Sequence, residues 1–178
     1  MGKLTITEAL AEIKTINARI VKKREAAARY LARDARLRDP LEGDGGSAEF
    51  IKKERQAIGD LEQRIVGLRC AIQSANLSKT LEIGEMTRSV SAWLNWRREI
   101  SQGAKGFLNG LVNGLNQVRQ QALKQGLNLT DKETGQAGDI VVALNERQLA
   151  KEVEMMEQTL GDLDGKLSLL NATTTIEG

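Results

Sequence analysis

Paired carboxylates are the side chains in this 178-residue chain that come closest to a catalytic pattern. Glu152 and Glu154 form one pair, and Asp162 and Asp164 form a second. Two carboxylates held near each other can act as a general acid and a general base. Both pairs fall on the solvent side of a predicted helix, however, where carboxylates far more often serve as solvated charge. The pairs therefore do not indicate a catalytic centre.

Other candidates for chemistry are equally incomplete. Cys70 is the only cysteine, and the chain has no histidine to act as its base, so we expect it to pack beside a helix seam. Asp131, Glu133 and Asp139 lack the ligand spacing of a calcium loop, and residues 43–46 lack the Lys-Ser/Thr ending of a phosphate loop. The sequence therefore predicts no enzyme, no cofactor and no metal site.

The composition favours long helices. Hydrophobic residues make up 40% of the chain but aromatic residues only 3%, and there is one proline. Few aromatic residues suit narrow helix–helix seams better than a broad globular core. We therefore expect an all-α or mainly-α fold.

The clearest helical pattern lies in residues 47–75. Its apolar positions recur in steps of three and four, with Glu54 in the one gap, as in a helix that packs lengthwise on others. The seam consists of Ile51, Ile58, Leu61, Ile65, Leu68, Ile72 and Ala75.

A partner helix precedes it. Thr5 and Glu8 form a capping box, and the pattern continues until Asp39, whose following proline disfavours helix. Its predicted seam is Ile6, Leu10, Ile13, Asn17, Ile20, Arg24, Ala27 and Leu31. A loop over 39–46 and a cap at Ser47 then give an antiparallel helical hairpin over 1–78.

The remaining chain adds shorter elements and two further long helices. We expect a strand at 80–83, a helix segment within 79–126 anchored on the helical hairpin by Trp93 and Trp96, and a turn or β-like insert at 127–144. Gly126 should end the third helix, and Asn145 should cap the last one, over 145–171. The tail 172–178 is expected to fray. Together these elements predict a single elongated bundle with a small β element.

A glycine ridge marks the third helix. Gly106, Gly110 and Gly114 recur at steps of four beside Phe107 and Leu111. Glycine at this spacing permits close approach of a neighbouring helix, from another subunit for example, or else makes a hinge. Because the apolar face around the ridge is broad, we predict that these five residues form an oligomer interface.

Charge is unevenly distributed. Residues 19–38 hold eight Lys and Arg against two acids, and residues 131–178 hold ten acids against four bases. We expect the two regions to lie near each other in the fold or assembly, and the alternative is that each region faces a different partner. Lys22, Arg29, Arg33 and Arg36 share one predicted helix face, which is by default a solvated stripe. A contact with nucleic acid or an acidic partner is the alternative.

Short motifs along nearly the whole chain resemble the septicolysin-like family of uncharacterised, mostly helical bacterial and phage proteins. They are Thr7-Glu8-Ala9-Leu10, Asn76-Leu77-Ser78-Lys79-Thr80, Leu163-Asp164-Gly165-Lys166 and Asn171-Ala172-Thr173-Thr174. The chain departs from the family in its basic first helix, its glycine ridge and Ala172, where the family tends to carry an aromatic residue. The resemblance implies no catalytic residues, and it suggests a phage protein.

These patterns together predict a non-enzymatic structural or assembly protein, a bacteriophage virion component of the capsid, collar or tail that oligomerises through its helices. Its expected partners are itself and other virion proteins. It lacks a secretory hydrophobic region and any apolar run of membrane-span length, so we expect it to be made in the cytoplasm. A nucleic-acid-binding or packaging accessory is the second hypothesis, and a membrane-active helical protein the third.

Overall fold

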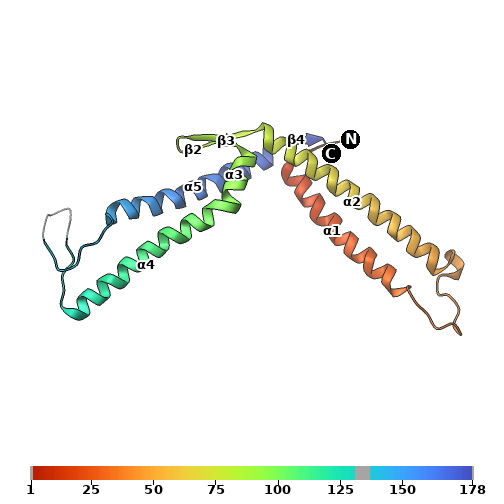
Figure 1. Cartoon of the computed structure of the whole chain (residues 1–178). Coiled ribbons are helices and arrows are strands. Elements are labelled where there is room, and N and C mark those ends of the chain that lie inside the picture. The colour runs from red at the N-terminus through yellow and green to blue at the C-terminus, as the bar shows by residue number, and fades with distance from the viewer. Residues whose placement is uncertain (1, 131–136, 178) are drawn as a thin grey trace. The chain divides into compact units, whose positions relative to one another are not determined.

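The computed structural model describes residues 2–130 and 137–177 (Figure 1). Four long helices, shorter helical segments and two small antiparallel ribbons make up the described secondary structure, which confirms the mainly-α prediction. The residues group into two compact units, one of Met1–Ser78 with Ser168–Gly178 and one of Lys79–Leu167. That the whole chain acts as one elongated domain stays a prediction.

The first unit is built on the predicted helical hairpin of α1 (Ile6–Arg29) and α2 (Gly46–Ser78) (Figure 1). The amide of Glu8 donates to Thr5 Oγ1 at 3.2 Å and the amide of Thr5 donates to the Glu8 carboxylate at 2.7 Å, which confirms the capping box.

The core of the hairpin follows the predicted α2 seam, where Leu68 and Ile72 are buried. On α1 the buried stripe is rotated from the predicted one. Ala9 and Ile16 are buried in place of Leu10 and Asn17, which are exposed. Both stripes contain the isoleucines that recur at every seventh position. They differ in the residue between two such isoleucines, which is three positions after the first in the structure and four positions after it in the prediction. The α1 core residues are Ile6, Ala9, Ile13, Ile16 and Ile20.

The first helix ends at Arg29, so the prediction that it continues to Asp39 is wrong. Beyond it, the amide of Arg36 donates to the Asp34 carboxylate at 3.0 Å, a local bond that competes with helical hydrogen bonding. The loop also holds a 3-10 turn, η1 (Glu42–Asp44).

The C-terminal residues do not fray as expected. Strand β4 (Thr175–Glu177) pairs antiparallel with β1 (Lys3–Thr5), and Leu4 lies opposite Ile176. Ile176 is buried in the same core as α1 and α2. The described ends of the chain are thus joined in one ribbon.

The second unit begins with a β-hairpin of β2 (Thr80–Ile83) and β3 (Met86–Ser89). The strand predicted at 80–83 is confirmed, and its partner is β3. Gly84 makes the turn with a positive φ of 57°.

A helical run follows, made of α3 (Val90–Trp96), a π-helical turn η2 (Arg97–Ser101) and α4 (Gln102–Gln125). The Ser89 hydroxyl accepts a hydrogen bond from the amide of Ala92, so Ser89 is the N-cap of α3. Trp93 is fully buried and its Nε1 donates to the carbonyl of Leu81 at 3.0 Å. The sequence predicted that Trp93 packs on the helical hairpin. In the structure the Trp93 indole instead bonds to β2.

The last helix, α5 (Glu146–Thr173), lies beside α4 (Figure 1). Gly126 ends α4 with a φ of 68°, and Asn145 accepts from the amide of Gln148, so both predicted helix ends are confirmed. Between the helices, the described residues hold one isolated bridge, from Leu129 to Ile140. Asp131 and Glu133 lie outside the described residues.

Candidate functional site

Ion pairs hold α5 against the run of η2 and α4. In each pair the base comes from the earlier segment and the acid from α5, and as the base advances along the chain the acid recedes, as antiparallel helices require. The pairs are Arg97–Asp164 at 2.6 Å, Lys105–Glu157 at 3.2 Å, and Arg119–Glu146. The side chains are more than a third exposed, so each pair is worth at most about 1 kcal/mol and mainly fixes register.

The side of α4 turned away from α5 carries no charge. Between positions 102 and 123 the only charged residues are Lys105 and Arg119, and both bind α5. In a chain with 28% charged residues such a helix surface is unusual, and depletion of charge marks the centres of protein interfaces. We call this surface the α4 outer face: Gly103, Gly106, Phe107, Gly110, Asn113, Gly114 and Gln117.

The glycines of this face are not required by packing against the described residues. A Cβ atom added at Gly106, Gly110 or Gly114 would meet nothing within 4 Å outside its own helical turn. Each glycine lowers helix propensity by about 1 kcal/mol relative to alanine. Phe107, beside them, is 67% exposed. The α4 outer face is therefore smooth, uncharged and uncovered by the described residues.

An apolar groove opens along one edge of the α4 outer face, between α4 and the extended residues 140–144. It has a volume of about 340 Å³. Gly110, Leu111 and Gly114 contribute from α4, and Val141, which is 68% exposed, contributes from the opposite wall. The sequence predicted Leu111 as part of an oligomer interface and residues 127–144 as a turn or β-like insert, and it did not predict that residues 140–144 line a groove with α4. We call this space the α4 groove.

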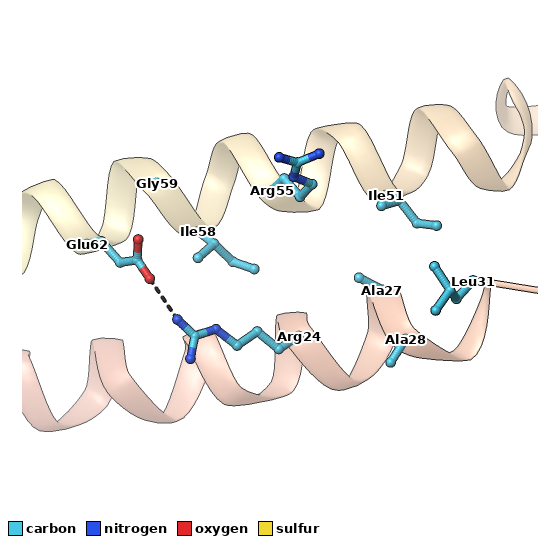
Figure 2. A pocket seen from close by; sticks show the side chains of 9 residues that line it. All are labelled: Arg24, Ala27, Ala28, Leu31, Ile51, Arg55, Ile58, Gly59 and Glu62. Carbon is cyan, nitrogen blue, oxygen red and sulfur yellow. Dashed lines mark hydrogen bonds and ion pairs between the residues drawn. The ribbon is translucent and has the colours of Figure 1, made fainter.

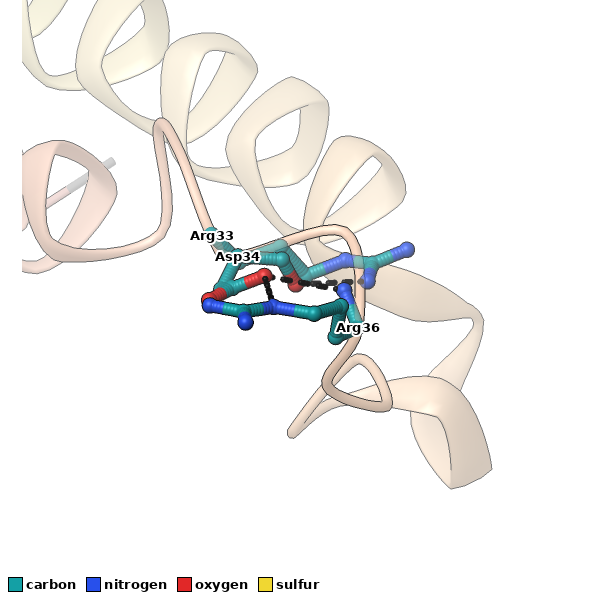
Figure 3. A network of polar contacts seen from close by, with 3 residues as sticks. All are labelled: Arg33, Asp34 and Arg36. Carbon is teal, nitrogen blue, oxygen red and sulfur yellow. Dashed lines mark hydrogen bonds and ion pairs between the residues drawn. The ribbon is translucent and has the colours of Figure 1, made fainter.

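The predicted basic stripe is divided by the structure. Lys22 and Arg29 are exposed on α1, whereas Arg33 and Arg36 lie in the following loop, so their placement on one helix face is wrong. In Figure 3 Arg36 reaches the Asp34 carboxylate, at 2.7 Å, and its hydrogen bonds lower the pKa of Asp34. A contact of these four residues with nucleic acid stays a prediction.

Each unit pairs some of its charged residues internally. In the helical hairpin, α2 supplies an acid to Lys23 at 3.1 Å and another to Arg24 at 2.7 Å. In the second unit, three acids of α5 bind the bases of η2 and α4. The basic and acidic regions predicted to lie near each other thus each have partners in their own unit.

A second groove lies between α1 and α2, toward the loop (Figure 2). It has a volume of about 430 Å³ and a mainly aliphatic lining that includes Leu31 and Ile51. The Arg24–Glu62 ion pair spans the two helices beside it (Figure 2). Its lining offers no nucleophile with a neighbouring base.

Among the described residues, the candidates for chemistry are not gathered into one site. Cys70 is exposed, so the prediction that it packs beside the seam is wrong. Glu152, Glu154 and Asp162 are exposed on α5, and Asp164 binds Arg97. Among residues 2–130 and 137–177, no cluster of three or more Cys, Asp or Glu is placed to hold a metal ion. None of the described helices has the length and apolarity to cross a membrane.

No protein-family model, curated protein or solved structure matches the chain. Function is therefore inferred from the described surfaces themselves.

Proposed function

We propose that the chain is a non-enzymatic structural or assembly protein that associates with further copies of itself through its helices. The observation that carries this proposal is the α4 outer face. Its helix has 24 residues, of which only Ala122 is buried among the described residues. The face is uncharged, lined with glycine, and exposes Phe107.

These properties suit contact with another helix better than contact with water. Glycine lets a second backbone approach closely, which gives dispersion contacts along the helices. Burial of an exposed phenylalanine adds about 1.5–3 kcal/mol. At 1.5 Å per residue, α4 is about 36 Å long, which gives room for an extended contact.

A second copy of the chain is the simplest partner for such a face. Asn113 and Gln117 are polar positions of this face, and each carries both donors and acceptors without a charge. Two charged faces of one sign would repel, and this face has no charge to repel its own copy.

Sedimentation equilibrium tests this proposal. We expect the mass to exceed the 19.5 kDa of one chain and to rise with protein concentration. Gly110→Arg places a charge on the α4 outer face and should return the protein to one chain. Gly67→Arg is the matched control, because Gly67 lies on α2 with open space at its Cβ position. A wild-type mass of one chain throughout the micromolar range contradicts self-association.

As the setting we propose a bacteriophage virion, in its capsid, collar or tail, with other virion proteins as further partners. The support for this setting is the family resemblance. Quantitative mass spectrometry of purified particles tests it, with many copies per particle as the expected result. Absence from the particles excludes the setting and leaves self-association untouched.

A further inference from the structure

We propose that two copies pair through antiparallel α4 helices about a two-fold axis at Gly110, and that Phe107 of each copy enters the α4 groove of the other. This proposal rests on the self-association proposed above and specifies its geometry.

The glycine spacing is symmetric about Gly110. Gly106 lies four residues before it and Gly114 four residues after it. An antiparallel pair centred on Gly110 therefore sets Gly106 opposite the partner's Gly114, and the reverse contact follows by symmetry. All three positions have open space where a side chain would begin. This register brings the two backbones together where neither carries a side chain.

Phe107 and the α4 groove then complement each other. Phe107 lies three residues before Gly110 in the chain. In the antiparallel pair it therefore lies opposite the partner's Asn113, three residues after Gly110, and beside the partner's Gly114. Gly114 lines the α4 groove, and Phe107 does not line the groove of its own chain. The phenyl ring is 67% exposed and the groove is apolar, with a volume of about 340 Å³. Reciprocal insertion covers both apolar surfaces at once.

The charges at the ends of the run are compatible with the antiparallel direction. Glu99 precedes the uncharged stretch and Lys124 follows it, both exposed. In the proposed register, Lys124 lies about three residues, or about 4.5 Å along the axis, from the partner's Glu99. Glu99 also binds Arg98 of its own chain, at 2.6 Å. A parallel pair would instead place like charges side by side at both ends.

Disulfide cross-linking tests the register. All variants carry Cys70→Ser, because Cys70 is exposed and would cross-link by itself. Gly110→Cys lies on the axis and should form a covalent dimer rapidly under mild oxidation. Gly103→Cys should not, because its counterpart is displaced by 14 residues, about 21 Å, whereas a disulfide needs Cα atoms within about 7 Å. A mixture of Gly106→Cys and Gly114→Cys proteins of different mass should cross-link to each other.

Three outcomes separate this proposal from the one on which it rests. Cross-linking of Gly103→Cys as fast as Gly110→Cys indicates a parallel pair and overturns the antiparallel register. An oligomer in which Gly110→Cys stays uncross-linked overturns the α4 pairing while self-association stands. A protein that sediments as one chain contradicts both.

The insertion of Phe107 is tested by affinity. Phe107→Ala should weaken dimerisation about tenfold or more, as expected for an aromatic anchor at the centre of an interface. Met155→Ala is the control, since Met155 is 63% exposed on α5 and outside the α4 outer face. Circular dichroism verifies that both variants keep their helices. An unchanged dissociation constant for Phe107→Ala overturns the insertion.

Discussion

The carboxylate of Asp39 accepts two hydrogen bonds from Ser47, one from the backbone amide at 2.8 Å and one from the hydroxyl at 2.6 Å. It also accepts one from the amide of Leu41 at 2.9 Å. The first turn of α2 is thus capped by a residue eight positions earlier, and the loop is closed by the same group. These bonds lower the pKa of Asp39 to about 2.

We predict that Asp39→Ala lowers the thermal stability of the protein at neutral pH. Because the folded-state pKa is below the ordinary value of 3.8, the contribution of Asp39 is fully present above pH 3.8 and is lost as pH falls through about 2. The difference in Tm between wild type and Asp39→Ala should therefore be constant above about pH 5 and shrink in acid. Asp44→Ala, in the same loop, is the control. A difference that persists unchanged at pH 2 would contradict the capping role.

The ion pair of Lys23 with Glu54 should contribute more than its neighbours. Glu54 occupies the polar gap in the α2 seam, and its side chain is only 16% exposed. Lys23→Met should destabilise the protein by about 1 kcal/mol, because it leaves this carboxylate without its cation. Glu54→Leu in the same chain should recover most of the loss, since both positions are then apolar.

A double-mutant cycle in urea measures this coupling. The Arg24–Glu62 pair provides the comparison, since its side chains are 62% and 51% exposed and its coupling should be smaller. Equal coupling energies for the two pairs would show that burial of Glu54 has no effect on the strength of its interaction.

Trp93 should be the most sensitive position of the second unit. Its indole is fully buried and its Nε1 bonds the carbonyl of Leu81. Trp93→Phe removes that donor and should destabilise the protein by about 1–3 kcal/mol. Trp96→Phe is the control, because Trp96 is half-buried and contacts Trp93 edge to face. Urea unfolding followed by circular dichroism gives both values, and a larger effect at Trp96 would refute the anchoring role of Trp93.

Local sequence signals predicted the features that depend on near neighbours. The capping box of Thr5, the cap at Asn145 and the end at Gly126 all follow from residues within one helical turn, and all were correct. The α2 seam was also correct, because apolar spacing at 3.6 residues per turn decides which side is buried.

Features that depend on side-chain hydrogen bonds in a loop, or on residues distant in sequence, were missed. The first helix ends early because Asp34 and Asp39 bind amides of the loop, which no periodicity reveals. Residues 140–144 line a groove on α4, although their alternation favours a strand. The sequence singled out four residues of the α4 outer face, Gly106, Phe107, Gly110 and Gly114, but the absence of charge from that face depends on the structure, in which Lys105 and Arg119 of α4 bind acids of α5.

The β1–β4 ribbon leads to a prediction about the end of the chain that the sequence alone did not suggest. Ile176 is 7% exposed and belongs to the core of α1 and α2, whereas its neighbour Glu177 is exposed. Ile176→Ala should lower the free energy of unfolding by about 2–4 kcal/mol, because it removes buried methyl groups and leaves a cavity beside Leu4. Glu177→Ala should change it by less than about 0.5 kcal/mol. Urea denaturation measures both, and equal effects of the two substitutions would mean that the ribbon does not contribute to the core.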